Sequence, residues 1–168
     1  MNYPAWWNRE LTLYNRIEAP NGEIVWRGNQ LAGCFLKRVD GISKNGSVLV
    51  SSESVVIRIP AKTNFISAQE WQQRLELLYT TEQNKMEQLY DEYGAEMFNH
   101  EDVLGNLFTV QTGDIVVAAP VTDQLNEYEA GKRAADLFAK YNAVGCFSVE
   151  TVTVNTAHIP AHYKVVAK

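Results

Sequence analysis

The sequence lacks the long apolar segments and the cysteine patterns that mark several classes of protein. None of its apolar runs reaches the roughly 18 to 20 residues of a membrane-spanning helix. Residues 1–10 do not combine a basic stretch with an apolar one, so we expect no secretory signal and a protein used in a cytoplasm or in a particle built there. The two cysteines, Cys34 and Cys146, each lie between glycine and phenylalanine, a setting typical of buried thiols, and they form no zinc-binding pattern.

Motifs for catalysis and nucleotide binding are also missing. Residues 41–46 come within one residue of a nucleophile elbow, but they fall between two predicted strands. No glycine-rich phosphate loop is present. His158 and His162 are four residues apart, but Pro160 lies between them, so the spacing favours a polar loop over a metal site. We therefore predict a protein that is not an enzyme and has no catalytic residues, metal ligands or cofactor.

Charge is unevenly distributed along the chain, although the net charge is only −5. Residues 67–105 carry nine acidic and two basic side chains, whereas the rest carries eleven acidic and thirteen basic ones. The acidic segment, which includes Asp91 and Glu92, is interpreted either as a solvated helix face or as a surface for a basic partner. The body has no basic stripe, which argues against a reader of nucleic-acid sequence.

Alternating apolar residues predict a series of short strands. Residues 11–15 and 24–27 form the first hairpin around a turn at 19–22. The run at 115–119 is continuously apolar, which predicts a strand buried on both faces. A polar loop is expected at 40–46. The remaining predicted strands are 31–39, 47–51, 54–59 with Pro60 as its end, 107–110, 145–155 and 163–166.

Helical spacing replaces this alternation in two places. Ser67 and Glu70 form a capping box, and a break near Thr80 is favoured, which would give a helical hairpin instead of one long helix. A further helix is predicted over 124–142, capped by Asp123. The fold class is therefore α+β and mainly β. We expect a small antiparallel barrel or sandwich of SH3-like or OB-like type, forming a single domain over 1–168 with an acidic helical insertion at about 67–105.

Aromatic residues supply most of the candidate interaction sites. Trp6 and Trp7 precede the first strand, and they either fold back over the core or anchor into a neighbouring subunit. The candidate interface residues combine such aromatics with charged positions, and they are Trp6, Trp7, Arg9, Trp26, Lys44, Trp71, Asp91 and Glu92.

Several motifs spread along the chain carry a resemblance to a known group of proteins. They include Gly113-Asp114 before an apolar strand, Gly131-Lys132-Arg133, and the segments 11–16, 25–27, 31–37, 56–60, 108–117, 127–133, 137–141, 149–155 and 162–165. Together they resemble a family of small uncharacterised phage and prophage morphogenesis proteins, over most of the chain except 67–105. The Gly-Asp turn also resembles that of head-closure (stopper) and head–tail connector proteins of tailed phages.

The resemblance implies a structural virion protein, assembled in the bacterial host. It would form a homo-oligomeric ring of roughly six or twelve copies around the DNA channel, between portal or adaptor and tail proteins. DNA would pass without sequence-specific binding, and no membrane would be involved. A tail-completion or terminator protein is one alternative. Another class is an OB-like single-stranded nucleic-acid-binding protein, with Tyr14, Trp26 and Phe35 as stacking platforms, which the net charge opposes.

Overall fold

The chain consists of two compact units, residues 1–61 with 110–168, and residues 62–109. A computed structural model describes residues 4–19, 22–45, 48–62, 64–89, 104–155, 157 and 160–168, with backbone only for 40–45, 48–53 and 81–89. No helix among the residues it describes is long and apolar enough to cross a membrane.

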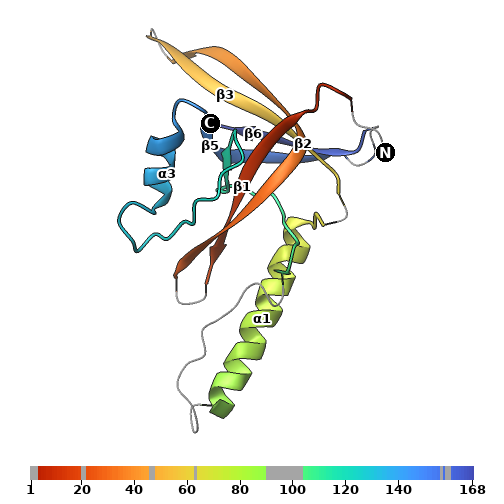
Figure 1. The fold of residues 1–168 in the computed structure, drawn as a ribbon, viewed down its shortest axis with the longest axis vertical. Coiled ribbons are helices and arrows are strands. Elements are labelled where there is room, and N and C mark those ends of the chain that lie inside the picture. Colours follow the sequence, from red (N-terminus) through yellow and green to blue (C-terminus); the bar gives the residue numbers. More distant parts are fainter. Residues whose placement is uncertain are drawn as a thin grey trace. The chain divides into compact units, whose positions relative to one another are not determined.

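The first unit is a closed antiparallel barrel, which confirms the predicted fold class (Figure 1). Its strands follow one another around the barrel in the order β1-β2-β3-β6-β5-β4, and β4 pairs back onto β1. Two three-stranded meanders thus close on each other through the β3–β6 and β1–β4 pairs. The strands are β1 (Arg9–Glu18), β2 (Ile24–Asn45), β3 (Val48–Pro60), β4 (Ile115–Val117), β5 (Cys146–Asn155) and β6 (His162–Ala167).

Strand β2 is one continuous strand of 22 residues, so the prediction of separate strands at 24–27 and 31–39 was wrong. Its first part pairs with β1 and its second part with β3. The pairing partner changes at Gly33, where the β1–β2 register shifts and φ is +71°, a conformation that glycine adopts without strain. A bulge at this point lets one strand bend from one sheet into the next.

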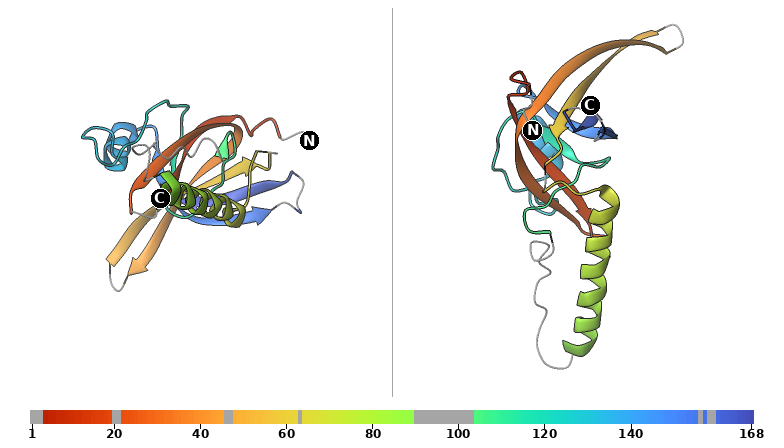
Figure 2. Two further views of the ribbon diagram at one scale, coloured as in Figure 1. Left: turned by 90° about the horizontal axis from the view of Figure 1, so that it is seen from below. Right: turned by 90° about the vertical axis from the view of Figure 1, so that its right-hand side faces the viewer.

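The predicted polar loop at 40–46 is also a correction, because residues 40–45 continue β2 and pair with β3 residues 48–53. The predicted strands at 47–51 and 54–59 are likewise one strand, β3, which ends at Pro60 as expected. Strand β6 pairs with β3 only from Val55 onward, so residues 40–45 and 48–53 form a two-stranded arm (orange and yellow in Figures 1 and 2).

Strand β4 is buried on both faces, as its apolar run predicts. Val116 is paired with Leu13 in the barrel wall, and both are buried. The other side of β4 forms a second core with helix α3 (Ala134–Tyr141), made of Tyr14, Ile115, Val117 and Leu137. The two layers explain why β1, unlike an ordinary half-exposed strand, buries five consecutive residues.

The predicted helix over 124–142 was wrong in extent, because α3 begins only at Ala134. Gly131 has a φ of +84°, which a right-handed helix cannot accommodate. Asp123 caps nothing, since its carboxylate instead accepts hydrogen bonds from Lys140 and Tyr141. Segment 118–133 is a loop that folds against the barrel.

The second unit contains α1 (Ala68–Leu89), one continuous helix, so the favoured break near Thr80 was wrong. The Thr80 hydroxyl donates to the Glu76 carbonyl oxygen inside the helix instead of capping a new one. Ser67 does cap α1, because its hydroxyl accepts the Glu70 backbone N–H at 3.1 Å. Around 107–110 there is a single bridge between Phe65 and Phe108 instead of a strand. Residues 90–103 of the predicted hairpin lie outside the described residues.

Candidate functional site

The N-terminal segment forms a turn on the outside of the barrel. Trp7 donates its backbone N–H to the Pro4 carbonyl oxygen at 2.9 Å. The Trp7 indole is 6% exposed and packs edge-to-face on His162, with ring centroids 5.4 Å apart. Trp6 is 56% exposed and contacts the Phe35 ring, edge-to-face at 5.0 Å. The turn therefore leaves one of its two indoles largely accessible.

Strand register defines the surface on which this turn lies. Ile57, Ile59 and Val165 are buried inside the barrel. The alternate residues Arg58 and Lys164 therefore point outward, and they are paired directly with each other. One outward row thus crosses four strands, and it consists of Phe35, Arg58, Lys164 and Thr153.

Arg58 links the aromatic and basic parts of this row. Its guanidinium carbon lies 5.1 Å from the centroid of the Phe35 ring, within the range of a cation–π contact. The next outward row consists of Lys37, Val56, Val166 and Thr151. The two rows together hold three bases and no acid. We call the outer sheet face the surface formed by Trp6, Phe35, Lys37, Val56, Arg58 and Lys164.

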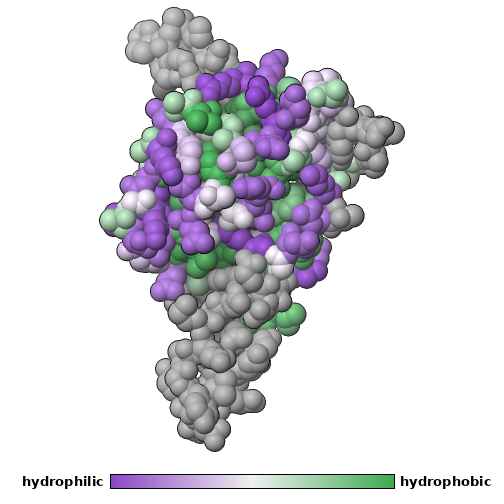
Figure 3. Space-filling model, in the orientation of Figure 1, coloured by the Kyte–Doolittle hydropathy of each residue, from purple (hydrophilic) through white to green (hydrophobic). Residues whose placement is uncertain are grey.

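This surface has the composition of a protein interface. Tryptophan, phenylalanine and arginine are enriched in interfaces relative to the remaining surface, and tryptophan and arginine frequently dominate their binding energy. Figure 3 shows one side of the molecule, where hydrophobic areas lie among hydrophilic ones over the described residues. The outer sheet face is the place where an exposed tryptophan and an arginine meet.

The structure separates the two alternatives considered for the N-terminal tryptophans. Trp7 folds back and is buried, whereas Trp6 is exposed beside Phe35. The remaining candidates are scattered. Arg9 is exposed at the start of β1, and Trp26 is half-buried, with its indole N–H donating to Glu127 at 2.6 Å. Lys44 lies in the arm, where only the backbone is described.

Three of the candidate residues belong to the second unit. Trp71 is fully buried, so its ring is not available to a partner in this conformation. Asp91 and Glu92 lie outside the described residues. Of the eight sequence-predicted residues, only Trp6 belongs to the outer sheet face, and the buried Trp7 packs beside it with ring centroids 5.8 Å apart.

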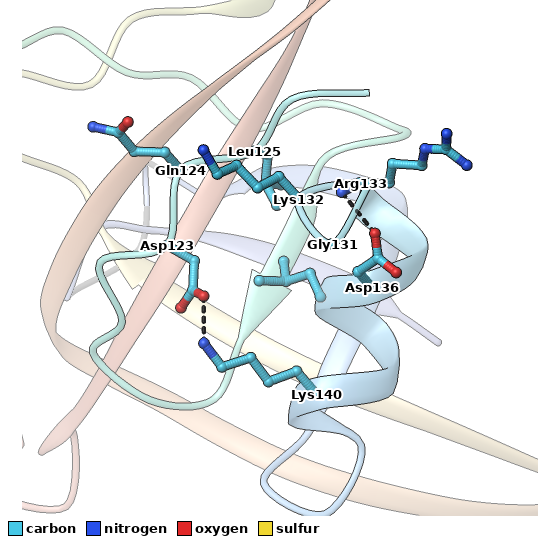
Figure 4. Close-up of a pocket in the computed structure, with 9 residues that line it drawn as sticks. Asp123, Gln124, Leu125, Gly131, Lys132, Arg133, Asp136 and Lys140 are labelled. Atoms are coloured by element: carbon cyan, nitrogen blue, oxygen red, sulfur yellow. Dashed lines mark hydrogen bonds and ion pairs between the residues drawn. The ribbon is translucent and has the colours of Figure 1, made fainter. Parts of the chain in front are cut away.

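A shallow pocket of about 410 Å³ lies between α3 and the preceding loop (Figure 4). Both of its carboxylates accept hydrogen bonds from residues of the loop or of α3. Asp123 accepts hydrogen bonds from the Lys140 ammonium at 2.5 Å and the Tyr141 hydroxyl at 2.6 Å. These hydrogen bonds, led by that from Lys140, lower the pKa of Asp123. Asp136 accepts the Arg133 backbone N–H, while the Arg133 guanidinium points away from Asp123. Hydrogen bonds between the loop and α3 thus hold the walls of the pocket in place.

The turn before β4 holds a buried carboxylate. Asp114 is completely inaccessible and accepts three hydrogen bonds of 2.8 to 2.9 Å, from the Asn15 side chain and from the backbone N–H groups of Arg16 and Gln111. Burial raises the pKa of Asp114 to about 7, although the three hydrogen bonds oppose this shift. The side chain ties the 111–114 turn to β1, which is a structural role and does not involve an open cleft.

Neither cysteine is placed for nucleophilic chemistry. Cys34 is buried, and burial raises the pKa of the Cys146 thiol to about 12, so thiolate is scarce at neutral pH. Among the residues that the structure describes, no three histidine, cysteine or acidic side chains could hold a metal ion together. The absence of enzyme activity stays a prediction.

Tyr14 cannot act as a stacking platform for nucleic acid. The side chain is 1% exposed, and its hydroxyl donates to the Asp123 carbonyl oxygen at 2.9 Å. The ring packs in the core beneath α3.

Sequence reasoning missed Arg58 and Lys164 as surface residues of interest. The alternation of Val55, Ile57 and Ile59 already places Arg58 on the outward side of its strand. The neighbouring strand and its register were not predictable from this alternation, so the meeting of Arg58 with Lys164 and Phe35 became visible only in the barrel.

Residues 6–87 match the model of a family of unknown function (DUF6751). No curated protein and no solved structure matches the chain. The matched region runs through β1, β2 and β3 and ends at Glu87, close to the end of α1. The first half of the barrel and its acidic helix are therefore similar to this family as one continuous piece, which includes part of the segment that had been interpreted as an insertion.

Proposed function

We propose that this protein is a structural subunit of a tailed-phage neck, a head-closure or head–tail connector protein that forms a ring around the DNA channel between portal and tail. Its role is assembly, and its chemistry consists of contacts between copies and with the layers above and below. The virion is its site of action, and DNA passes through the ring without being read.

One observation carries this proposal, the outer sheet face on a small closed barrel. Trp6, Phe35 and Arg58 form an accessible aromatic and basic surface that the strands hold in fixed register. The two-stranded arm of residues 40–45 and 48–53 extends past the end of β6, and such an arm suits contact with a neighbour or with a channel. A ring subunit requires surfaces of this kind on different sides of a rigid body.

The test is the composition and shape of the assembled particle. Purified full-length protein is expected to form closed rings in negative-stain electron microscopy, and virions of the parent phage are expected to contain the chain by mass spectrometry. Virions that assemble, eject DNA and lack this chain would contradict the proposal. Cross-linking distinguishes the layers, since a connector contacts the portal side, whereas a tail terminator contacts the end of the tail tube.

A single-stranded nucleic-acid-binding role is the second candidate, because Trp6 and Phe35 lie beside Arg58 and Lys164 on the barrel surface. Aromatic side chains flanked by bases are the usual platform for stacked nucleotides. Salt-sensitive binding of the protein to oligo-dT, measured by fluorescence anisotropy, favours this role. Its absence leaves the connector role as the better supported one.

A further inference from the structure

The two units of the chain carry opposite charge. Residues 62–109 hold nine acids and three bases, whereas the barrel unit holds eleven acids and twelve bases. On the barrel, the two rows of the outer sheet face contain three bases without an acid. Helix α1 itself carries four acids and two bases, so its net charge is opposite to that of the outer sheet face.

The apolar side chains are complementary as well. Helix α1 buries Trp71, Leu75 and Leu78, but it exposes Glu76 and Leu77. Leu77 is 67% exposed, so one large apolar side chain of the helix lies outside its buried side. The exposed side of α1 thus presents a carboxylate next to an apolar group.

We propose that the outer sheet face of one copy binds helix α1 of a second copy of this chain. Leu77 of the second copy packs against Trp6 and Phe35. Its neighbour Glu76 pairs with Arg58. This proposal rests on the proposed function, because it names the contact through which ring subunits recognise one another.

A contact of this type is heterologous, since it joins two different surfaces. Each copy in a pair keeps one unused outer face or one unused helix, so further copies can add, and a ring results where the rotation between neighbouring copies closes. The continuous α1, seen as a single green rod in Figures 1 and 2, is about 33 Å long at 1.5 Å per residue. Because the paired charges lie near the surface, salt weakens the contact.

Charge reversal on the outer face tests this contact in the full-length protein. The double variant Arg58→Glu with Lys164→Glu is expected to weaken self-association by about tenfold or more. The measurement is molar mass by light scattering after size exclusion, at salt concentrations of about 0.05 M and about 0.5 M. Lys132→Glu is the matched control, because Lys132 is exposed on the loop before α3 and pairs only with Glu129 among the ion pairs described. It is expected to assemble like the natural chain.

Mixing two defective variants gives a sharper test. Leu77→Asp disables the helix and leaves the outer face intact, whereas the double charge reversal disables the face and leaves the helix intact. A heterologous contact predicts that each variant alone is monomeric and that the mixture forms one-to-one dimers and nothing larger. Circular dichroism melting of each variant checks that its fold is unchanged.

Several results would overturn the inference. They are a natural chain that stays monomeric at all concentrations, a face variant that assembles normally, and a mixture that forms no dimers. A face variant that loses oligo-dT binding but keeps its assembly would assign the surface to nucleic acid instead. Failure of the proposed function looks different, since the contact would then pass these tests while virions lack the chain.

Discussion

Strand β4 has an aspartate on either side of it, and the two occupy opposite environments. Asp114, directly before β4, is inaccessible and accepts three hydrogen bonds from uncharged donors. Asp123, six residues after β4, has a side chain that is 26% exposed, and it accepts hydrogen bonds from Lys140 and Tyr141. The pKa of Asp114 is raised by burial, whereas that of Asp123 is lowered by its partners. The buried carboxylate thus holds the turn against β1, whereas the partly exposed one holds residues of the surface helix α3.

The largest effect on stability is expected from Asp114→Ala. Removal of the carboxylate takes away the acceptor of three hydrogen bonds, which come from the Asn15 amide and from the backbone N–H groups of Arg16 and Gln111. The expected loss in the free energy of unfolding is about 3 kcal/mol or more, measured by urea denaturation. A loss as small as that of Asp123→Ala would contradict the structural role of this turn.

The pH dependence of stability should separate the two aspartates. The folded pKa of Asp114, about 7, lies above the ordinary value of 3.8, so the folded state retains a proton that the unfolded state releases. Stability therefore falls as the pH rises from about 4 to about 7. Asp123 behaves in the opposite way, because its stabilising contribution is present above its ordinary pKa of 3.8 and is lost as the pH falls below it.

Asp114→Asn checks this assignment. It keeps the shape of the side chain and removes the titration, so the slope between about pH 4 and pH 7 should flatten relative to the natural chain. Asp123→Asn is the matched control and should leave that slope in place. Urea denaturation at a series of pH values gives both results, and an unchanged slope in Asp114→Asn would assign the titration to another group.

An intermediate effect is expected from Glu127→Ala. The Glu127 carboxylate accepts hydrogen bonds from the Trp26 indole N–H at 2.6 Å and from the backbone N–H of Ala134 at 3.2 Å. Ala134 is the first residue of α3. Loss of the carboxylate removes a helix cap and should cost about 1 to 2 kcal/mol, with a change in tryptophan fluorescence. Glu129→Ala on the same loop is the control, since its exposed ion pair with Lys132 contributes little.

The smallest effect is expected from Asp123→Ala. The Lys140 pair is exposed on the lysine side, so solvent screens it and its loss should cost about 1 kcal/mol or less. Denaturation in urea with and without added salt measures this. A cost equal to that of Asp114→Ala would show that the α3 loop is as important to the barrel as the buried turn.

Local patterns predicted the elements whose burial follows from their own residues. The apolar run at 115–117, the Ser67 cap and the end of β3 at Pro60 are of this kind. Local sequence patterns failed where contacts with residues distant in the sequence determine the structure. Residues 124–133 were predicted as the first part of a helix, but Glu127 and Asp123 bind Trp26, Lys140 and Tyr141 instead of supporting helical turns.

The outer sheet face was only half predictable for the same reason. The two tryptophans stood out in the sequence, but their separation into one buried and one exposed ring depends on His162 and Phe35, which lie far from them along the chain. Arg58 and Lys164 are 106 positions apart and meet only because β3 pairs with β6. Cross-strand register, which sets such pairs, is not encoded within either strand alone.

The unbroken backbone of β2 has a mechanical consequence. The strand that closes the barrel against β1 is the same one that extends into the arm, and Phe35 follows directly on the bulge where it changes partner. A pull on the arm is therefore transmitted through covalent bonds to the position of Phe35, without an intervening joint. Phe35 lies on the same side of the Gly33 bulge as the arm, so the arm and the aromatic corner beside Trp6 share one uninterrupted length of strand.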